Sequence, residues 1–348
     1  MASPFHYTPV LVNLLADAQG LYRQLEAESE IPSLALRLIK ENQVLASHYS
    51  TSIEGNPLNQ EEVTNILLGD KIPTTKSERE VKNYFAVLNR ISVLAREKTP
   101  LSIELVLRFH GELMDGLATK NPGQFRNGPV IVGHNSMAGL VVKHNPPSHT
   151  AKEIQLLLFD LLQSIKEDQE NHPLLKAGLL HHGFTYIHPF FDGNGRMARI
   201  LTAYYLLLNS YEVTKYFILD DYYDIDRLQY SDMLHSADEG EETKWLEYFL
   251  EGITFSLQAA IKRVEAVKGE AVDAVTGLKR VLVSKREEEV LQMVIEKQML
   301  KSSDIVEAFG VTRQQAQALL GSLVRKGLLA KHGVTKSSYY ELVKKQTE

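Results

Sequence analysis

Apolar residues recur at three- and four-residue spacing along most of the chain, which is the pattern of helices with one buried face. The pattern predicts helices over Leu21–Leu45, Ser77–Arg96, Ser102–Gly116, Thr150–Glu170, Pro173–Tyr186, Arg196–Ser210 and Thr243–Val267. A further helix is expected after Asn59, whose side chain can cap it, with Glu61 and Glu62 in its first turn. Residues 128–147 break the pattern, because two β-branched runs flank Gly133–Gly139, and we predict a β-hairpin there. We therefore expect a mainly α protein with one small hairpin in its main part.

The last segment, residues 281–348, has an organisation of its own. It contains 11 basic and 8 acidic residues, a balance of +3 in a chain of net charge −6, so the preceding residues carry −9. Its pattern predicts helices at Glu288–Glu296, from Ser302 to Gly310 and from Thr312 to Lys326, then a β-prone segment at Ser338–Leu342. This order resembles a winged helix-turn-helix. Ala271–Leu278 is expected to be the connection.

Two functions are open for this tail. In the first, the start of its third helix contacts DNA through Arg313, Gln314, Gln315 and Gln317. In the second, the tail is a protein-interaction or dimerisation module. A helix that contacts DNA usually carries more cations than one arginine near its start, which weighs against DNA.

Composition limits the chemistry that the chain can perform. With 348 residues, the chain is long enough for about two or three domains. Hydrophobic residues make up 44% and charged residues 24%, which are ordinary globular values and exclude disordered and low-complexity classes. The absence of cysteine excludes disulfides, thiolate zinc sites, iron–sulfur clusters and thiol nucleophiles. Catalysis is left to histidine, carboxylates, hydroxyls or a hard cation such as Mg²⁺.

The sequence indicates no leader and no membrane partner. Residues 1–20 contain no Lys or Arg and so lack the charged start of a secretory signal. The densest apolar stretch, Ala203–Leu208, is too short to cross a bilayer. The acidic balance argues against a chain that coats nucleic acid or anionic membrane. We expect a cytoplasmic protein.

Residues 187–199, Ile-His-Pro-Phe-Phe-Asp-Gly-Asn-Gly-Arg-Met-Ala-Arg, carry the candidate chemistry. The glycines of Gly193–Gly195 permit positive φ and let backbone N–H groups approach a ligand. A helix is expected to begin at about Gly195–Arg196, and its N-terminus attracts anions. Arg196 and Arg199 share one face near that end. Together these groups form a cradle for a polyphosphate.

Two further side chains complete this candidate site. Asp192 lies within the positive region, and a carboxylate beside phosphates is the usual ligand of Mg²⁺. His188 stands at the mouth of the loop, where a neutral imidazole could take a proton from an incoming hydroxyl. A base, a metal ligand and a phosphate cradle describe phosphoryl or nucleotidyl transfer to a protein hydroxyl.

The stretch resembles the signature of Fic-domain proteins, His-x-Phe-x-Asp/Glu-Gly-Asn-Gly-Arg-x-x-Arg. Every defining position matches, at His188, Phe190, Asp192, Gly193, Asn194, Gly195, Arg196 and Arg199. The resemblance implies an all-helical Fic fold and transfer of AMP from ATP to a Ser, Thr or Tyr hydroxyl of a target protein. It also implies a target-docking flap at the hairpin of residues 128–147, where a segment of the target adds a strand within Val130–Val142. The alternative is a structural hairpin without a ligand.

The resemblance also implies a role for each signature residue. His188 would be the general base, Asp192 the Mg²⁺ ligand and Phe190 a core anchor. The anion hole would consist of Gly193, Asn194 and Gly195. The phosphate contacts would come from Arg196, which holds the outer phosphates, and Arg199, which reaches the γ-phosphate.

A second motif, Ser-Thr-Ser-Ile-Glu-Gly at residues 50–55, precedes the signature. Leu38–Ile53 is predicted to be a helix that stops at Gly55, which places Glu54 in its last turn. The helix dipole disfavours a carboxylate there, and Arg199 could supply the compensating cation. With Ser50, Glu54 and Gly55 at its defining positions, the motif resembles the Fic inhibitory motif, Ser/Thr-x-x-x-Glu-Gly/Asn. By that resemblance Glu54 pairs with Arg199 and keeps ATP from a productive position, and in some members it helps water remove AMP from a target.

Other side chains near the signature are expected to pack in the core. His181 and His182 lack the spacing of a metal motif, so packed helix histidines are the favoured interpretation. Trp245 and Phe249 are also expected in the core. Three tyrosines are left open between the adenine site and the core: Tyr222, Tyr223 and Tyr230.

These observations predict three regions and one main function. The regions are an N-terminal helical region at 1–100 with an inhibitory helix at about 38–54, a Fic catalytic core at 101–270, and a winged helix-turn-helix at 281–348. The main function is that of an autoinhibited protein adenylyltransferase that uses ATP and Mg²⁺. The alternatives are removal of AMP by the same site, and a nucleotide-sensing regulator that binds DNA through 281–348. The family resemblance also allows a homodimer.

Overall fold

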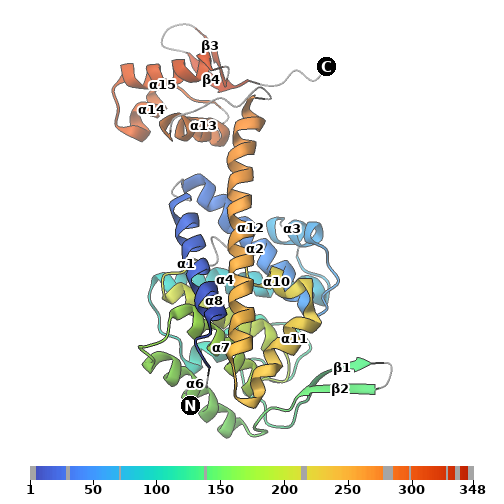
Figure 1. Ribbon diagram of the computed structural model, residues 1–348. Coiled ribbons are helices and arrows are strands. Elements are labelled where there is room, and N and C mark those ends of the chain that lie inside the picture. The colour runs from blue at the N-terminus through green and yellow to red at the C-terminus, as the bar shows by residue number, and fades with distance from the viewer. Residues whose placement is uncertain are drawn as a thin grey trace. The chain divides into compact units, whose positions relative to one another are not determined.

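The computed structural model describes residues 5–28, 32–69, 72–136, 139–212, 218–276, 285–297, 299–326, 328–333 and 338–343 (Figure 1). It is mainly helical, as predicted. The chain divides into two compact units, unit 1 at Met1–Ile261 and unit 2 at Lys262–Glu348. The predicted region boundaries at 100 and 281 stay predictions.

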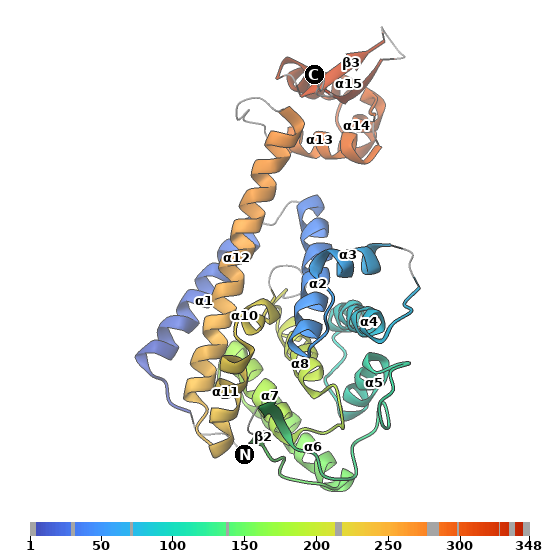
Figure 2. The ribbon, with the colours of Figure 1, turned by 90° about the vertical axis from the view of Figure 1, so that its right-hand side faces the viewer.

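Unit 1 consists of helices and one β-hairpin. Its helices are α1 (Pro9–Glu28), α2 (Pro32–Ile53), α3 (Gln60–Leu68), α4 (Lys76–Arg96), α5 (Ile103–Leu113), α6 (Ala151–Glu167), α7 (Pro173–Ile187), α8 (Asn194–Leu208), α10 (Asp220–Ile225), α11 (Arg227–Ser236), the 3₁₀ helix η1 (Ala237–Glu239) and α12 (Thr243–Thr276), which continues past the end of the unit. Helix α2 packs between α4 and α10, which Figures 1 and 2 both show.

Polar caps begin several helices where the sequence predicts them. The side chain of Asn59 accepts a hydrogen bond from the N–H of Glu62, and the Glu62 side chain accepts one from the N–H of Asn59. The side chains of Ser102 and Thr150 cap α5 and α6 by accepting from the N–H groups of Leu105 and Glu153. Each cap satisfies a backbone donor that the helix itself leaves free.

Two expectations about the helices need correction, and two helices were not predicted. The stretch Leu21–Leu45 is not one helix but falls on α1 and α2, with residues 29–31 outside the described residues. Helix α12 runs to Thr276 and so includes the first part of the predicted connection Ala271–Leu278, because residues 271–276 contain no glycine or proline to end it. Helices α10 and α11 are too short and polar for their periodicity to predict them.

The centre of unit 1 is formed by α7 and α8, which pack against each other. Most side chains of α7 are buried on every face, which is typical of a central helix. The predicted core positions of Trp245 and Phe249 are confirmed, since both are 0% exposed. The indole N–H of Trp245 donates to the carbonyl of Gly178 at 2.9 Å. A side chain at Gly178 would come within 2.7 Å of Leu246, so the glycine lets α12 approach α7.

The predicted hairpin is present as strands β1 (Val132–Ser136) and β2 (Gly139–His144), which pair antiparallel. Figure 1 shows it projecting beyond the helices of unit 1. Residues 137 and 138, at its tip, lie outside the described residues.

Unit 2 contains α13 (Lys285–Lys297), α14 (Ser302–Phe309), α15 (Arg313–Arg325), β3 (Leu329–His332) and β4 (Tyr339–Leu342). Strands β3 and β4 pair antiparallel. Gly310 ends α14 with φ +60°, and Thr312 caps α15, both as predicted. A compact core that includes Val290, Leu300 and Leu320 joins these elements. In the part of the chain that the structure describes, no helix is both long enough and apolar enough to span a membrane.

Candidate active site

The signature residues lie in the loop between α7 and α8. His188 follows α7 in the left-handed conformation, with φ 50° and ψ 61°. Gly193 is also left-handed, with φ 79°, and a side chain there would come within 2.8 Å of Met114 Sδ. Helix α8 begins at Asn194, slightly earlier than predicted, so its free N–H groups face the loop.

The side chain of Asn194 closes this loop on itself. Its Oδ1 accepts from the N–H of Phe190 at 2.9 Å, and its Nδ2 donates to the Phe190 carbonyl at 2.9 Å. The side chain is therefore fully used, and any anion contact of Asn194 falls to its backbone N–H. Phe190 is 0% exposed, as expected of a core anchor.

His110 of α5 supports the loop through contacts with Phe190 and Asp192, and no motif in the sequence indicated this role. Its ring stacks on Phe190 with centroids 3.6 Å apart. Its Nδ1 accepts from the N–H of Gly123 at 2.9 Å, so Nε2 carries the hydrogen and donates to the Asp192 carbonyl at 3.1 Å. Burial lowers the pKa of His110 to about 4, so the ring stays neutral and keeps this tautomer.

Arg126 holds the end of α7, and no motif in the sequence indicated this role either. It is 0% exposed, and its Nε donates to the His188 carbonyl at 2.6 Å. Its Nη1 donates to the carbonyl of Gly128 at 2.8 Å, at the base of the hairpin. A guanidinium at a helix C-terminus also interacts favourably with the helix dipole. Arg126 therefore fixes His188 and the hairpin base together.

The ring of His188 is prepared to accept a proton. Its Nδ1 lies 3.3 Å from the carbonyl oxygen of Thr185, which can only accept, so Nδ1 carries the hydrogen. The lone pair is then on Nε2. Burial lowers the pKa of His188 to about 4, and the hydrogen bond to Thr185 only partly opposes this, so the ring is neutral near pH 7.

Asp192 offers a carboxylate at the edge of the site. Its side chain is 48% exposed. Its Oδ1 accepts from the N–H of Gly193 at 2.6 Å and lies 3.4 Å from Arg196 Nη2. Among the described residues its Oδ2 has no such contact, so an accessible oxygen lies beside a helix N-terminus. This fits Mg²⁺, which takes one or two carboxylates and keeps water and phosphate oxygens as its other ligands.

Arg196 is a buried cation with unused donors. It is 2% exposed, and its Nη1 lies 3.5 Å from Glu80 Oε1. Within the described residues, its Nε and Nη1 nevertheless have no hydrogen-bond partner. Buried charged donors normally find partners, so these atoms are available to an anionic ligand. The contact with Glu80 of α4 was not predicted.

Arg199 is held through its Nε and Nη2 atoms, and the expected ion pair with Glu54 is present. Arg199 Nη2 lies 2.8 Å from Glu54 Oε1, and Arg199 Nε donates to Ser50 Oγ at 2.7 Å. A second carboxylate, Asp220 of α10, lies 2.9 Å from Nε, and the sequence analysis did not predict it. Burial raises the pKa of Asp220 to about 6 although Arg199 opposes the shift.

Glu54 lies directly over the start of α8. Helix α2 ends at Ile53, so Glu54 follows the last turn instead of lying in it, and Gly55 reverses the chain with φ 88°. A side chain at Gly195 would overlap Glu54 Oε1, which shows how closely the carboxylate approaches the α8 backbone. Enclosure raises the pKa of Glu54, but Arg199 and Arg196 outweigh this and lower it overall. Glu54 thus takes an anion position at a helix N-terminus.

The histidines and tyrosines around the signature are mostly core residues. His181 and His182 are buried, as predicted. His181 Nε2 lies 2.8 Å from the hydroxyl of Tyr230, and Tyr230 stacks on Tyr223 with centroids 4.3 Å apart. These two tyrosines are therefore core residues, whereas Tyr222 is only half-buried.

Residues 100–206, which include the loop and most of α8, match the sequence model described as the Fic/DOC family. This stretch is therefore similar to a Fic domain. Protein adenylyltransferase Fic of Drosophila willistoni is 26% identical over 200 residues, which cover 57% of this chain and 38% of that protein. Protein adenylyltransferase fic-1 of Caenorhabditis briggsae is 24% identical over 246 residues, which cover 68% of this chain and 45% of that protein. The chain spans less than half the length of these curated relatives.

Solved structures show the same Fic fold. A Fic family protein from Desulfovibrio desulfuricans aligns with a TM-score of 0.67 and 23% identity over 100% of both chains. Fic-1 from C. elegans aligns with a TM-score of 0.59 and 20% identity over 74% of each chain. At this identity the likeness concerns the fold, and the predicted Fic fold is confirmed.

Proposed function

We propose that this chain is a protein adenylyltransferase, which transfers AMP from ATP to a Ser, Thr or Tyr hydroxyl of a target protein. The observation that carries the proposal is a neutral His188 at one end of the loop and, at the other, a buried Arg196 whose Nε and Nη1 have no hydrogen-bond partner among the described residues. His188 Nε2 takes the proton of the hydroxyl as its oxygen attacks the α-phosphorus. The bond between the α-phosphorus and the bridging oxygen then breaks, and pyrophosphate leaves. The adenylyltransferase names of the curated relatives support the same reaction.

The other signature residues bind the nucleotide in this proposal. The backbone N–H groups of Gly193–Gly195 and the start of α8 bind phosphate oxygens, and Arg196 holds the outer phosphates. Arg199 binds the γ-phosphate after its ion pair with Glu54 has broken. Asp192 holds Mg²⁺, which when bound neutralises phosphate charge. The target docks along the hairpin at 128–147, whose base Arg126 fixes to His188.

Ser50 and Glu54 are the regulatory residues of the proposal. The carboxylate of Glu54 neutralises Arg199 and covers Gly195, so ATP cannot place its γ-phosphate there while the ion pair persists. Ser50 Oγ fixes the same guanidinium from the other side. The site is therefore proposed to be autoinhibited by the end of α2.

Removal of AMP from a modified target is a second candidate function. One observation favours it: the Glu54 side chain is 34% exposed although it lies over the α8 N-terminus. A carboxylate in that place can orient a water molecule toward a bound phosphate. The same site would then run the hydrolytic reaction.

For unit 2 we propose a winged helix-turn-helix, with α15 as the recognition helix and β3–β4 as the wing. Arg313, Gln314, Gln315 and Gln317 are all exposed near the start of α15. Their exposure supports the alternative of a DNA-binding regulator that senses nucleotide through its Fic domain. Only one of these four side chains is a cation, so the adenylyltransferase remains the first proposal.

The test compares ATP labelled at the α-phosphate with ATP labelled at the γ-phosphate. The purified wild type, the Glu54→Gly variant and the double variant Glu54→Gly/His188→Ala are each incubated with lysate of the source cells. We expect α-label on protein, raised about tenfold or more in Glu54→Gly because Arg199 is freed. In the Glu54→Gly background, His188→Ala lowers transfer by about 10²–10⁴-fold but keeps nucleotide binding.

Glu97→Gly is the matched control, because Glu97 is an exposed glutamate at the C-cap of another helix, α4. It should label like the wild type. Unchanged labelling in Glu54→Gly would refute the autoinhibition, and transfer of the γ-label would refute adenylyl transfer. Persistent transfer in His188→Ala would remove His188 as the base.

A further inference from the structure

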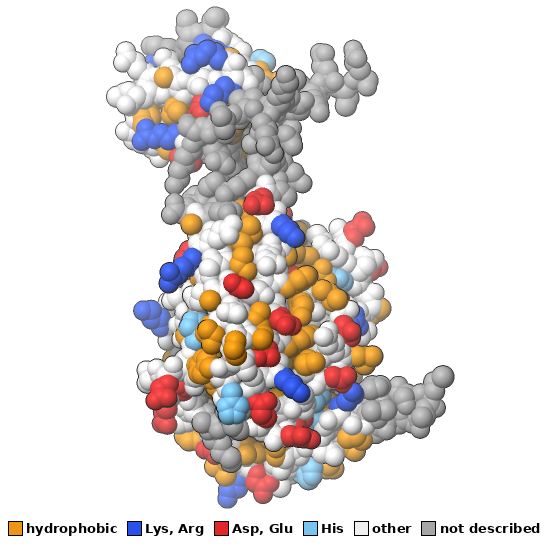
Figure 3. All heavy atoms as spheres, in the orientation of Figure 1, with side chains coloured by type: hydrophobic (Ala, Val, Ile, Leu, Met, Phe, Trp, Pro, Cys, Tyr) orange, Lys and Arg blue, Asp and Glu red, His pale blue; other side chains and the backbone are white. Residues whose placement is uncertain are grey.

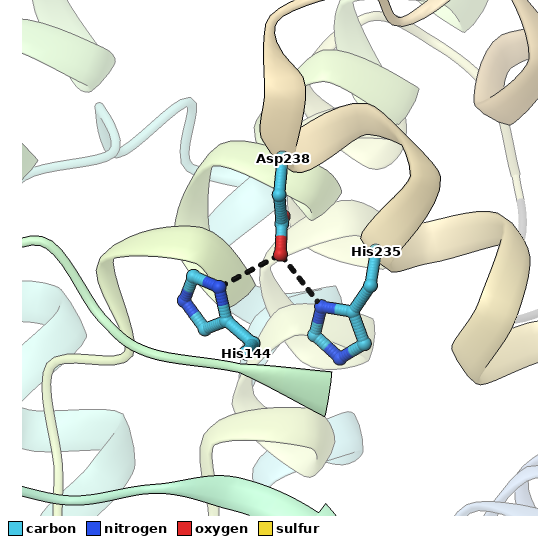
Figure 4. A group of neighbouring side chains, drawn as sticks. All are labelled: His144, His235 and Asp238. Atoms are coloured by element: carbon cyan, nitrogen blue, oxygen red, sulfur yellow. Dashed lines mark hydrogen bonds and ion pairs between the residues drawn. The ribbon is translucent and has the colours of Figure 1, made fainter. Parts of the chain in front are cut away.

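Outside the signature loop, two histidine side chains meet the carboxylate of Asp238. His144 lies at the end of β2, His235 lies in α11, and Asp238 lies in η1. Asp238 Oδ2 lies 2.7 Å from His144 Nδ1 and 3.0 Å from His235 Nδ1. Figure 4 shows both rings pointing their Nδ1 atoms at this one oxygen.

The hydrogen bond of His144 Nε2 determines whether its Nδ1 carries a hydrogen or a lone pair. His144 Nε2 lies 2.8 Å from the Tyr186 carbonyl oxygen, which can only accept, so Nε2 carries the hydrogen. A neutral His144 then directs the lone pair of Nδ1 at the lone pairs of Asp238 Oδ2. A cation between the two atoms removes this repulsion. An N–H donated to a backbone carbonyl is also the usual support of a metal-binding imidazole.

The second oxygen of Asp238, Oδ1, is bound by His182. Asp238 Oδ1 lies 3.0 Å from His182 Nε2, and His182 Nδ1 lies 2.8 Å from Glu242 Oε1. His182 therefore donates from both nitrogens to carboxylates, which fixes the orientation of Asp238 and leaves Oδ2 toward the two rings. Ligating carboxylates are commonly oriented by hydrogen bonds of this kind.

The donor set and the enclosure suit a transition-metal ion. The ligand atoms of the three residues all lie within 4.8 Å of one another. Their side chains are only 3%, 11% and 15% exposed for His144, His235 and Asp238. Two imidazole nitrogens and one carboxylate oxygen, with bonds of about 2.0–2.2 Å, are a common Zn²⁺ ligand set with a fourth position for water.

We propose that His144, His235 and Asp238 bind a divalent transition-metal ion of the Zn²⁺ type. The ion would tie the last residue of the hairpin strand β2 to α11 and η1. The neighbouring ion pair of Lys143 with Asp232 joins β2 to α11 as well, so the metal would strengthen an existing attachment. The site is distinct from Asp192, the residue proposed to hold Mg²⁺.

The test titrates the full chain, stripped with a chelator, with Zn²⁺ in buffer that contains Mg²⁺. We expect one Zn²⁺ per chain by calorimetry and a rise in Tm on addition of Zn²⁺. His235→Gln and the isosteric Asp238→Asn should each weaken binding by about tenfold or more. His149→Gln, an exposed histidine beside the hairpin, is the matched control and should bind like the wild type. Co²⁺ should give the visible absorption of a low-coordinate site in the wild type, and this absorption should be lost in His235→Gln.

An Asp192→Asn variant separates this site from the signature loop and should keep the Zn²⁺ stoichiometry. Circular dichroism and the metal-free Tm show whether His235→Gln and Asp238→Asn are folded. If one variant is unfolded, Zn²⁺ binding by the other tests the proposed site. The proposal is wrong if the wild type binds no stoichiometric Zn²⁺, which is the result expected if His144 simply carries a second proton. It is also wrong if folded His235→Gln binds as tightly as the wild type, or if Asp192→Asn alone abolishes binding.

Discussion

His188 combines a left-handed backbone with an enclosed neutral ring. Its N–H donates to the Phe184 carbonyl at 3.0 Å and so ends α7. Its carbonyl is taken by Arg126. A left-handed non-glycine residue costs about 1–2 kcal/mol, and these contacts hold it there.

The lowered pKa of His188 makes stability depend on pH. The pKa of His188 is 6.5 in the unfolded chain and about 4 in the folded protein, so the unfolded chain binds the proton more tightly. The free energy of unfolding is therefore highest above pH 6.5, and it falls as the pH is lowered from 6.5 toward 4. Between about pH 7.5 and about pH 5 we expect the wild type to lose about 2 kcal/mol more unfolding free energy than His188→Gln. Urea denaturation of both proteins at each pH measures this. An equal loss in the two would contradict the shift.

At the scale of elements, the loop between α7 and α8 depends on segments that are distant in the sequence. Helix α5 supplies His110, the segment before the hairpin supplies Arg126, and α10 supplies Asp220. The end of α2 supplies Glu54. The loop is short and rich in glycine, so its geometry is maintained by these neighbours more than by its own contacts.

Arg126→Met should be strongly destabilising. The change leaves the carbonyls of His188 and Gly128 without their buried donor, at a cost of about 3 kcal/mol in unfolding free energy. It should also lower labelling by the Glu54→Gly protein, because the His188 backbone loses its support. Chemical denaturation and the labelling assay measure the two effects.

Arg108→Met is the control for this change. Arg108 is 52% exposed on α5 and pairs with Glu112, so its loss should cost at most about 1 kcal/mol. A similar small loss for Arg126→Met would show that Arg126 does not hold the end of α7.

At the scale of the whole molecule, the basic tail lies entirely within unit 2, which begins at Lys262. Residues 281–348 carry +3 and the preceding residues carry −9. Figure 3 shows acidic side chains spread over the visible face of unit 1. Acidity spread over the surface does not oppose an anionic ligand at a site where Arg196 and Arg199 are buried.

A chain of residues 1–276 should therefore keep the activity proposed for the Fic domain. Every signature and inhibitory residue lies in unit 1, so in the Glu54→Gly background we expect labelling within about twofold of the full chain. The α-phosphate label measures this, and a loss of more than about tenfold would contradict it. A gel shift of a DNA duplex at low salt by the full chain, absent for residues 1–276, would favour the regulator alternative.

Local patterns in the sequence predicted most elements and the chemistry of the signature. Periodicity and caps, such as Asn59 and Thr312, act within a few residues, so the sequence alone indicates where most helices lie. Glycines at positive φ and a helix start are local as well, which is why the anion cradle could be recognised. The pair of Glu54 with Arg199 was foreseen from the helix end and the family resemblance, across a separation of 145 residues.

Only the tertiary structure identified the residues that hold this chemistry in place. His110 and Asp192 are 82 residues apart, and Arg126 and His188 are 62 apart, with no shared motif to connect them. The Asp238 group joins a strand end to a helix that periodicity did not predict. Such contacts depend on how helices pack, and packing brings together side chains whose positions in the sequence are unrelated. The sequence therefore determined the reactive groups, and the fold decided their partners, their burial and their protonation.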